Sequence, residues 1–439
     1  MSSLIFSPGG ASAVLFGIFF VLLFLRVPVA VALGLACLPM LVIEPHLSLM
    51  VLAQETFNAY NSFILLAVPF FLLTANLMNT GGITDRLVRL SRALVGQLPG
   101  SLAQINIVLS IFFAGISGSA TADAASQGKL FIEAQVKEGY DTSFSVAITA
   151  VSAVMAVIIP PSILMIVWGG VLTTSIGALF LAGIIPGLLM GLVQMATVHV
   201  YAKRRGYPTY EASSAGEIVR ALYVAVPALL TPVIIIGGKI FGWFTATESA
   251  CIAVLYAAIL SLVAYREMSL KGLYEALLDT GRLAGATLFC VGTASAFGWL
   301  MAFYQIPHAI LGGVNAWEMG PIATGFFVAA VFLVVGCFLD AIPAIIIVGT
   351  ILQPVARTAG LDPVHFAMIG IVSLAFGLVT PPYGLCLMIS CSIAGVRLGD
   401  VLKDTMIMLM PMFGVLILVI LWPQVTLFVP SLISPEFLR

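Results

Sequence analysis

Small and polar residues gather in one short stretch of this chain, Phe112 to Asp123 (FFAGISGSATAD), which lies between two apolar segments. In water such a stretch would form an exposed loop, but its flanks place it at the depth of a lipid bilayer. An unpaired peptide group there costs several kcal/mol, so irregular backbone persists only where protein surrounds it. Carbonyls freed at a helix end can bind a small cation such as Na⁺, and freed amides favour a carboxylate. The stretch therefore predicts an enclosed site for an ion and an acid.

A second interruption and two proline pairs repeat the same design. The stretch Val334 to Pro343 (VVGCFLDAIP) resembles the first, and its alignment places Asp340 opposite Asp123. Each stretch is followed by an apolar segment with adjacent prolines, Pro160-Pro161-Ser162 in one case and Thr380-Pro381-Pro382 in the other. Two prolines within a helix remove two amide donors and break it. The sequence therefore predicts two hairpins and two broken helices that converge on one site.

The predicted site uses backbone, hydroxyl and carboxylate groups of these four interruptions. Hydroxyls add neutral ligands, and an acid within an apolar membrane segment indicates function by default. The alternatives are close helix packing for the Gly/Ser cluster and a hydrogen-bonded helix cap for each acid. The predicted substrate-binding residues are Ser119, Thr121, Pro161, Ser162, Thr380, Pro381 and Pro382. The predicted Na⁺ ligands are Gly115, Ser117, Gly118, Asp123, Gly336, Asp340, Thr380 and Gly384.

The composition places these interruptions in a membrane protein. The chain has 439 residues, of which 61% are hydrophobic and 8% charged, and its mean hydropathy is +1.16. No soluble domain stays dispersed with that balance, so we expect an all-α polytopic protein surrounded by the lipid bilayer. The net charge of -1 offers no basic stripe, which argues against a nucleic acid partner.

Apolar segments and positive charges together predict two repeats of inverted topology. A span needs roughly 20 apolar residues, and on that basis each half contains five crossings, one re-entrant hairpin and one Pro-Pro-broken helix. Because five is odd, the halves have opposite orientations. The cluster Lys203-Arg204-Arg205 marks the inner face. We therefore expect residues 203–217 to be cytoplasmic and both termini to be periplasmic.

The expected boundaries follow from this order. The first repeat spans residues 1–205, with scaffold helices in 1–61, a hairpin at 98–135 and a broken helix at 143–172. A linker at 206–217 leads to the second repeat, residues 218–439, with scaffold helices in 218–265, a hairpin at 321–352 and a broken helix at 364–394. The second repeat is expected to contain an inner arm (Met268–Thr280), a separate crossing (Leu283–Tyr304), an outer arm (Ile306–Gly320) and a last crossing (Thr405–Val429). Such inverted repeats are typical of secondary transporters.

Four motifs of the chain resemble the large membrane subunit (M subunit, DctM-like) of the tripartite ATP-independent periplasmic (TRAP) transporters. They are GISGSATADAAS at Gly115–Ser126, IIPPSI at Ile158–Ile163, GWFTATESACIAVLYA at Gly242–Ala257 and GLVTPPYGL at Gly377–Leu385. The resemblance covers essentially the whole chain. It implies an elevator-type, Na⁺-driven importer of organic acid anions, such as C4-dicarboxylates, in a bacterial inner membrane. Two or more Na⁺ sites near the hairpin tips and no organic cofactor would be expected.

The resemblance also implies two partners. One is a periplasmic substrate-binding protein that delivers the anion, and the other is a small four-helix membrane subunit that braces the scaffold. Since the chain starts at the first scaffold span, we expect the small subunit to be a separate chain. The substrate itself stays open.

Three other functions are alternatives to a tripartite transporter. A stand-alone ion-coupled anion transporter would share the architecture and need no binding protein. An intramembrane aspartyl protease would need a Gly-x-Gly-Asp pattern, whereas Asp340 follows CFL, and neither HExxH nor GxSxG occurs. A channel would not require two inverted hairpins. The sequence therefore favours a transporter over an enzyme.

Overall fold

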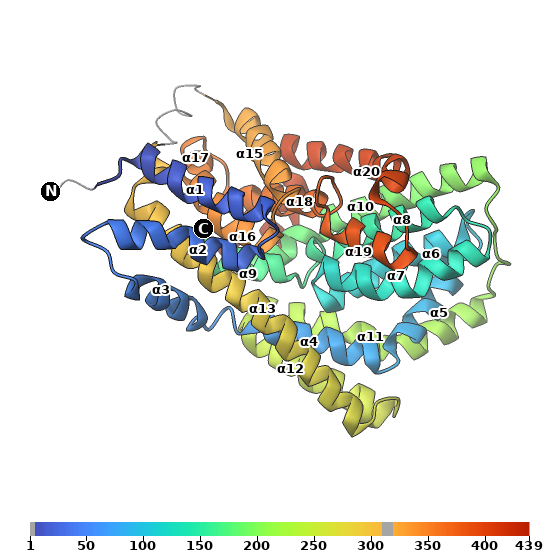
Figure 1. The fold of residues 1–439 in the computed structure, drawn as a ribbon. Coiled ribbons are helices and arrows are strands. Elements are labelled where there is room, and N and C mark those ends of the chain that lie inside the picture. Colours follow the sequence, from blue (N-terminus) through green and yellow to red (C-terminus); the bar gives the residue numbers. More distant parts are fainter. Residues whose placement is uncertain (1–4, 310–318, 439) are drawn as a thin grey trace.

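The computed structural model describes residues 5–309 and 319–438, and all regular structure within them is helical (Figure 1). This confirms the all-α prediction. Six helices of the described chain are long and apolar enough to cross a membrane. They are α10 (Ile176–Arg205), α11 (Ala215–Ile240), α12 with its π-helical end (Ala246–Ala264), α13 (Leu270–Phe303), the helix Ala341–Thr358 and α20 (Leu398–Leu421).

Shorter helices complete both halves of the chain. Those before α10 are α1 (Pro8–Phe24), α2 (Val29–Ile43), α3 (Met50–Tyr60), α4 (Ala67–Thr80), α5 (Ile83–Val95), α6 (Ser101–Ser117), α7 (Ala120–Lys137), α8 (Thr142–Ala153) with η1 (Val154–Val157), and α9 (Ile163–Leu172). Those after α13 are α15 (Pro321–Gly336), α16 (Ala341–Ala344), η3 (Ile345–Gly349), α17 (Thr350–Thr358), α18 (Pro363–Gly377), α19 (Leu385–Ala394), α21 (Gln424–Ile433) and η4 (Pro435–Leu438).

The helices pack in two groups, as Figure 1 shows. In one group, α13 packs on α2, α3 and α4, α12 packs on α4, and α11 packs on α5 and α12. In the other, α7 packs on α8 and α19, α15 packs on α18, and α10 packs on α20 and α21. The groups meet where α6 contacts α4, α5 and α11, where α4 contacts α9, where α10 contacts α11, and where α13 contacts α16 and η3. The hairpins and broken helices thus share one group, with α4 and α13 at its border.

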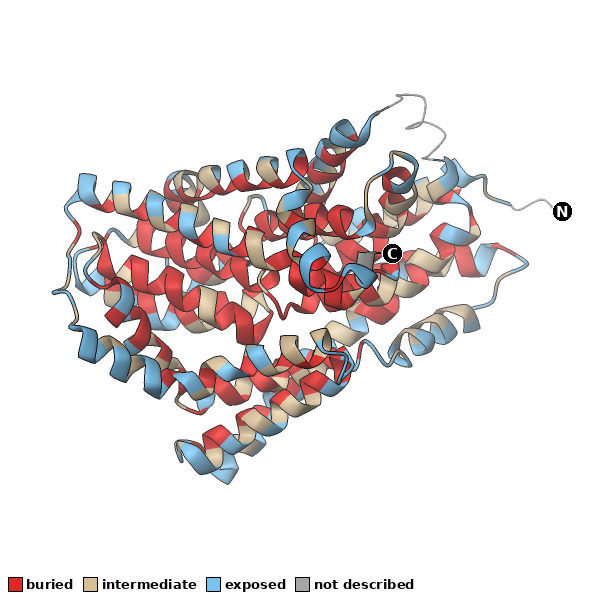
Figure 2. Cartoon of the chain, turned by 180° about the vertical axis from the view of Figure 1, so that it is seen from behind, coloured by how far each residue is buried: buried red, intermediate tan, exposed pale blue. Residues whose placement is uncertain are grey.

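The first halves of the two broken helices, α8 and α18, lie in the buried core, and Figure 2 shows how burial is distributed over the helices. From Phe144 to Ala153 in α8, and from Val364 to Gly377 in α18, every residue is buried. A helix that is apolar on all sides belongs in the interior of a large protein or a bundle. By contrast α3 has no buried residue.

Three expected boundaries are wrong. The predicted inner arm and the crossing Leu283–Tyr304 form one continuous helix, α13, because the lone Gly281 between them costs only about 1 kcal/mol and does not break a helix. The predicted last crossing is two helices, since α20 ends at Leu421 and α21 starts after Pro423. The hairpin expected to end at 352 extends to Thr358. Residues 310–318 of the predicted outer arm lie outside the described residues.

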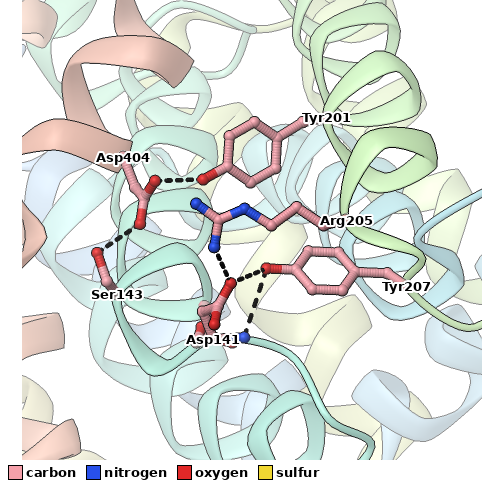
Figure 3. Close-up of polar contacts among 7 residues, drawn as sticks. Asp141, Ser143, Tyr201, Arg205, Tyr207 and Asp404 are labelled. Atoms are coloured by element: carbon pink, nitrogen blue, oxygen red, sulfur yellow. Dashed lines mark hydrogen bonds and ion pairs between the residues drawn. The ribbon is translucent and has the colours of Figure 1, made fainter.

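The predicted linker is partly ordered by polar contacts at one end of the molecule (Figure 3). Asp141, at the α7–α8 turn, accepts hydrogen bonds from Arg205 and from the Tyr207 hydroxyl, the latter at 2.6 Å. Asp404 of α20 accepts from Tyr201 and, at 2.6 Å, from Ser143. These contacts tie the start of α8, the end of α10 and the first turns of α20 together.

Tyr210 extends this attachment to the α5–α6 turn. Its amide donates to the Gly96 carbonyl at 3.1 Å, and its hydroxyl donates to Glu138 at 2.6 Å. Burial, and then the hydrogen bond to Glu138, raise the pKa of Tyr210, so the hydroxyl stays protonated as a donor. The first part of the linker is therefore attached to the body, and α11 begins beyond it at a Ser214–Glu217 capping box.

The second hairpin reaches the second broken helix through two glycines. The end of α15 at Gly336 and the end of α18 at Gly377 approach so closely that a methyl group on Gly377 would lie 2.6 Å from the Gly336 Cα. Real Cβ atoms do not come that near to backbone. The contact therefore requires glycine at position 377.

We predict that Gly377→Ala pushes the hairpin away from the broken helix and destabilises the fold. Overpacking of this kind costs about 1–3 kcal/mol, which would appear as a lower midpoint of thermal unfolding. The matched control is Gly414→Ala in α20, where an added methyl meets no heavy atom within 4 Å. Equal midpoints for the two variants would show that the glycine contact contributes nothing.

Candidate functional site

The first hairpin turns within two residues. Helix α6 ends at Ser117, Gly118 takes the left-handed conformation at φ 60°, and Ser119 begins α7 by accepting the Ala122 amide at 3.4 Å. The Gly118 carbonyl accepts the Ile163 amide at 3.2 Å, and a methyl on Gly118 would lie 2.8 Å from the Pro161 carbonyl. This tip therefore rests directly on the first broken helix.

The second hairpin is built in the same way with a longer turn. Three residues follow Gly336 before Asp340 begins α16, and the Asp340 carboxylate accepts the Ala341 amide at 2.8 Å. The Cys337 carbonyl accepts the Tyr383 amide at 3.1 Å, which joins this tip to the second broken helix. Each tip is thus hydrogen-bonded to the break of its own half.

The two broken helices differ in exposure. The first is interrupted at residues 158–162, where Ser162 caps α9 and donates to the Val157 carbonyl at 2.8 Å. Pro161 and Ser162 are buried. The second is interrupted at residues 378–384, where Thr380 donates to the Phe376 carbonyl at 2.7 Å. Thr380 and Pro381 are half-buried, and Pro382 is exposed.

A cavity of about 80 Å³ lies where the two tips meet the other helix group. Gly118, Ser119 and Thr121 of the first tip line it, and Asp340 of the second tip lies on the same cavity. Its remaining walls include Val68 and Leu72 of α4 and Thr287 of α13. The structure therefore brings the two tips together, as the sequence predicts, and adds a wall that the sequence did not reveal.

Most of the other predicted residues lie behind this cavity rather than on it. The broken helices contribute Ile163, Leu164 and Leu378 to its lining, whereas Pro161, Ser162, Thr380, Pro381 and Pro382 do not line it. Gly115 packs on Pro232 of α11: a methyl group added to Gly115 would lie 3.2 Å from the Cβ of Pro232. Thr287 was missed, since a single threonine in an apolar helix carries no local signal.

Asp123 is the most unusual group of the site. Its side chain is fully buried with the Ser117 hydroxyl as a polar neighbour, and neither carboxylate oxygen makes a hydrogen bond of normal geometry with a described residue. A buried carboxylate is costly unless an opposite charge or donors compensate it. Carboxylate, hydroxyl and carbonyl oxygens, as Asp123, Ser117 and the end of α6 provide here, are the ligands that hard cations prefer. The first tip could therefore hold a small cation.

The structure corrects the expected equivalence of the two acids. Asp340 occupies the N-cap of its helix, whereas Asp123 follows its N-cap, Ser119, by one turn. Ser119 is therefore the counterpart of Asp340 at the helix start. The alignment failed because the first turn has one residue between helix and cap and the second has three.

Asp340 is half-buried and fits the helix-cap alternative, since its carboxylate accepts a backbone amide. Asp123 makes no such contact with the described residues. The two acids thus have different roles in the structure, and the unpartnered one is the stronger candidate for an ion ligand.

Comparison with known proteins agrees with this architecture. The family profile "Tripartite ATP-independent periplasmic transporter, DctM component" matches residues 16–425. The chain is 37% identical to the sialic acid TRAP transporter large permease protein SiaM of Vibrio cholerae, over 94% of this chain and 96% of that protein. It is 35% identical to the isethionate TRAP transporter permease protein DctMQ of Oleidesulfovibrio alaskensis, over 94% of this chain and 66% of that protein.

A solved structure is similar in fold. The crystal structure of the Alcanivorax borkumensis YdaH transporter superposes with a TM-score of 0.57 at 13% sequence identity, over 85% of this chain and 87% of that one. At that identity the likeness concerns the fold alone. The profile match and the full-length relatives identify the chain as a member of the DctM family, the large permease component of TRAP transporters, which makes it a multi-pass membrane transporter and not an enzyme.

Proposed function

We propose that this permease imports an organic acid anion together with Na⁺, and that the ion and the anion bind at the two hairpin tips. The observation that carries the proposal is Asp123, a buried carboxylate without a described partner, one helical turn from the cavity residue Ser119. A bound cation would neutralise this carboxylate. The nearby helix start of α7 would then present its amides to the anion.

The size of the cavity supports a moving site. About 80 Å³ is far below the roughly 300–1,000 Å³ of ordinary ligand pockets. An acid such as a C4-dicarboxylate or a sugar acid therefore needs the tips to separate from Val68, Leu72 and Thr287. Each tip is hydrogen-bonded to its own broken helix, so a hairpin and its broken helix would move together against α4 and α13. This arrangement favours an elevator movement.

The repeats supply the framework for that movement. We infer that residues 1–205 and 218–439 are inverted repeats joined by the linker, and that helices of the α4–α13 group form the fixed scaffold. Positive charge at residues 203–205 favours a cytoplasmic linker and periplasmic termini in a bacterial inner membrane.

Two protein partners follow from the family description, which names a tripartite periplasmic system. We propose a small four-helix membrane subunit as one partner, because the relative named DctMQ extends beyond the 66% of its length that this chain matches. We also propose a periplasmic binding protein that delivers the acid. Sialic acid and isethionate, which appear in the names of these two relatives, are both organic acids. This supports an anionic substrate for the present chain without identifying it.

We predict that Asp123→Asn removes the stabilisation of the permease by Na⁺. Ligand binding to the folded state raises stability by about 2.7 kcal/mol at a concentration 100 times Kd, so the wild-type melting temperature should rise in NaCl relative to KCl. Asp340→Asn should weaken the same response to a smaller extent, because the Asp340 carboxylate already accepts the Ala341 amide. The control is Asp404→Asn, a buried acid that is hydrogen-bonded to Tyr201 and Ser143 away from the tips. An unchanged Na⁺ response in both tip variants would remove these acids from the ion site.

We predict that Ser119→Leu abolishes uptake, because the longer side chain fills a cavity of only about 80 Å³. Uptake of radiolabelled acids in proteoliposomes measures this. Ser269→Leu is the matched control, since Ser269 also caps a helix, α13, and lies exposed away from the tips. Both variants lose a helix cap worth about 1 kcal/mol. Normal transport by Ser119→Leu would place the substrate elsewhere.

We predict that uptake into proteoliposomes requires the binding protein. The assay compares the permease and its small subunit with and without the purified binding protein, in Na⁺ and in K⁺. Accumulation should occur only with binding protein and Na⁺. Full Na⁺-driven uptake without the binding protein would instead establish the stand-alone transporter.

A further inference from the structure

A second groove lies beside the first hairpin, separate from the cavity at the tips. It encloses about 430 Å³ between the hairpin and the α4–α5 turn. Asn79 and Thr84 line it from the α4–α5 side. Phe113 of α6 and the α7 residues Ser126, Gln127, Lys129 and Leu130 line it from the hairpin side. Its two sides therefore belong to the two groups of helices.

Three hydrogen-bond donors of this groove are unused. Lys129 is exposed and takes part in none of the ion pairs of the described residues. The Gln127 carboxamide oxygen accepts from Ser110 at 2.6 Å, while its Nε2 is buried without a described partner. The Asn79 oxygen faces the Thr84 hydroxyl at 3.5 Å, which leaves the Asn79 amide nitrogen as a donor. The groove therefore offers one ammonium and two amide groups.

The charge of Lys129 is not neutralised within the groove. None of the seven lining residues is acidic. Glu133, one turn further along α7, is paired with Lys137 at 2.7 Å. Asp85, next to Thr84 in the chain, is exposed and does not line the groove. A carboxylate from solution would supply the missing negative charge.

One stripe of α7 connects the groove to the cavity. Thr121 lines the cavity, and Ser126 and Lys129 line the groove. At 1.5 Å per residue, about 12 Å separate Thr121 from Lys129 along the helix. Thr121, Ala122, Ala125 and Ser126 are half-buried and Lys129 is exposed, at intervals typical of one helix face. The two alanines leave room beside the helix.

We propose that Asn79, Gln127 and Lys129 form a second carboxylate-binding station, which receives the substrate anion from the hairpin tips before it leaves on the inner side. The assignment rests on the proposed import of an organic acid. It adds a cationic release site, distinct from the tip cavity, at which Lys129 supplies the charge and the two amides orient the carboxylate.

The test measures thiol modification in inside-out membrane vesicles. Ser126→Cys is placed in a background with Cys251→Ser and Cys290→Ser, the two native cysteines that are only partly buried. Anionic sulfonatoethyl and cationic trimethylammonioethyl methanethiosulfonates are compared, each normalised to its reaction with free mercaptoethanol. We expect the anionic reagent to be favoured, and adding Lys129→Gln to lower that preference about five-fold, as expected for loss of one nearby charge.

Lys137→Gln is the matched control, because Lys137 lies on the same helix, outside the groove, and is paired with Glu133. It should leave the preference unchanged. Succinate at millimolar concentration should slow modification with Lys129 present and not in Lys129→Gln. Leu130→Cys, at another lining residue, replaces Ser126→Cys if that variant does not fold. An equal preference with and without Lys129, or a thiol inaccessible at both positions, would overturn the proposal.

A transport measurement separates this inference from the proposed function. In proteoliposomes with the binding protein, Lys129→Gln should lower the maximal uptake rate about five-fold with KM for the loaded binding protein unchanged, and Lys129→Arg should restore it. Absence of uptake by the wild type would defeat the proposed function. Full uptake by Lys129→Gln would defeat the release station alone.

Discussion

Backbone that leaves a helix inside a membrane must find hydrogen-bond partners within the protein, because the lipid supplies none. This constraint organises the chain. In each hairpin tip, a carbonyl accepts a hydrogen bond from an amide of the proline-broken helix. The Gly118 carbonyl accepts from the Ile163 amide, and the Cys337 carbonyl accepts from the Tyr383 amide. The same interruptions leave other peptide groups and the Asp123 carboxylate at the centre of the bundle. The irregular backbone is therefore both the structural problem and the source of the binding groups.

The two halves meet this constraint with different side chains. Ser119 and Asp340 both cap the helix that follows a tip, but only the first half carries an additional buried acid one turn further on. The first break is buried, and the second is partly exposed. The two halves thus differ: the acid of the second half accepts a backbone amide, whereas the buried acid of the first half is the one proposed to bind a cation. These differences between the two tips, and not the architecture that they share, distinguish the candidate ion site.

The two hairpin tips face α4 and α13 across the cavity. Val68, Leu72 and Thr287 close the cavity without hydrogen-bonding to either tip among the described residues. Few directional contacts cross this boundary, whereas each tip is hydrogen-bonded to its own broken helix. Sliding along such a boundary costs less than separating a hairpin from its broken helix, which is the physical basis for the movement proposed above. The groove at Lys129 lies on the same boundary and would change with it.

The sequence by itself determined the all-α membrane class and the positions of the four chain interruptions. These depend on local chemistry, since glycine, serine and adjacent prolines interrupt a helix wherever they occur. The tertiary structure alone decided that α13 is continuous, that Asp123 and Asp340 are not equivalent, and that Thr287 faces the tips. The unused donors around Lys129 were also invisible, because Asn79 and Gln127 are far apart in the sequence and line the same groove only in the folded chain. The local sequence determines where a helix begins, ends or breaks. Cavity walls and unpaired groups arise instead from packing between segments that are distant in the chain.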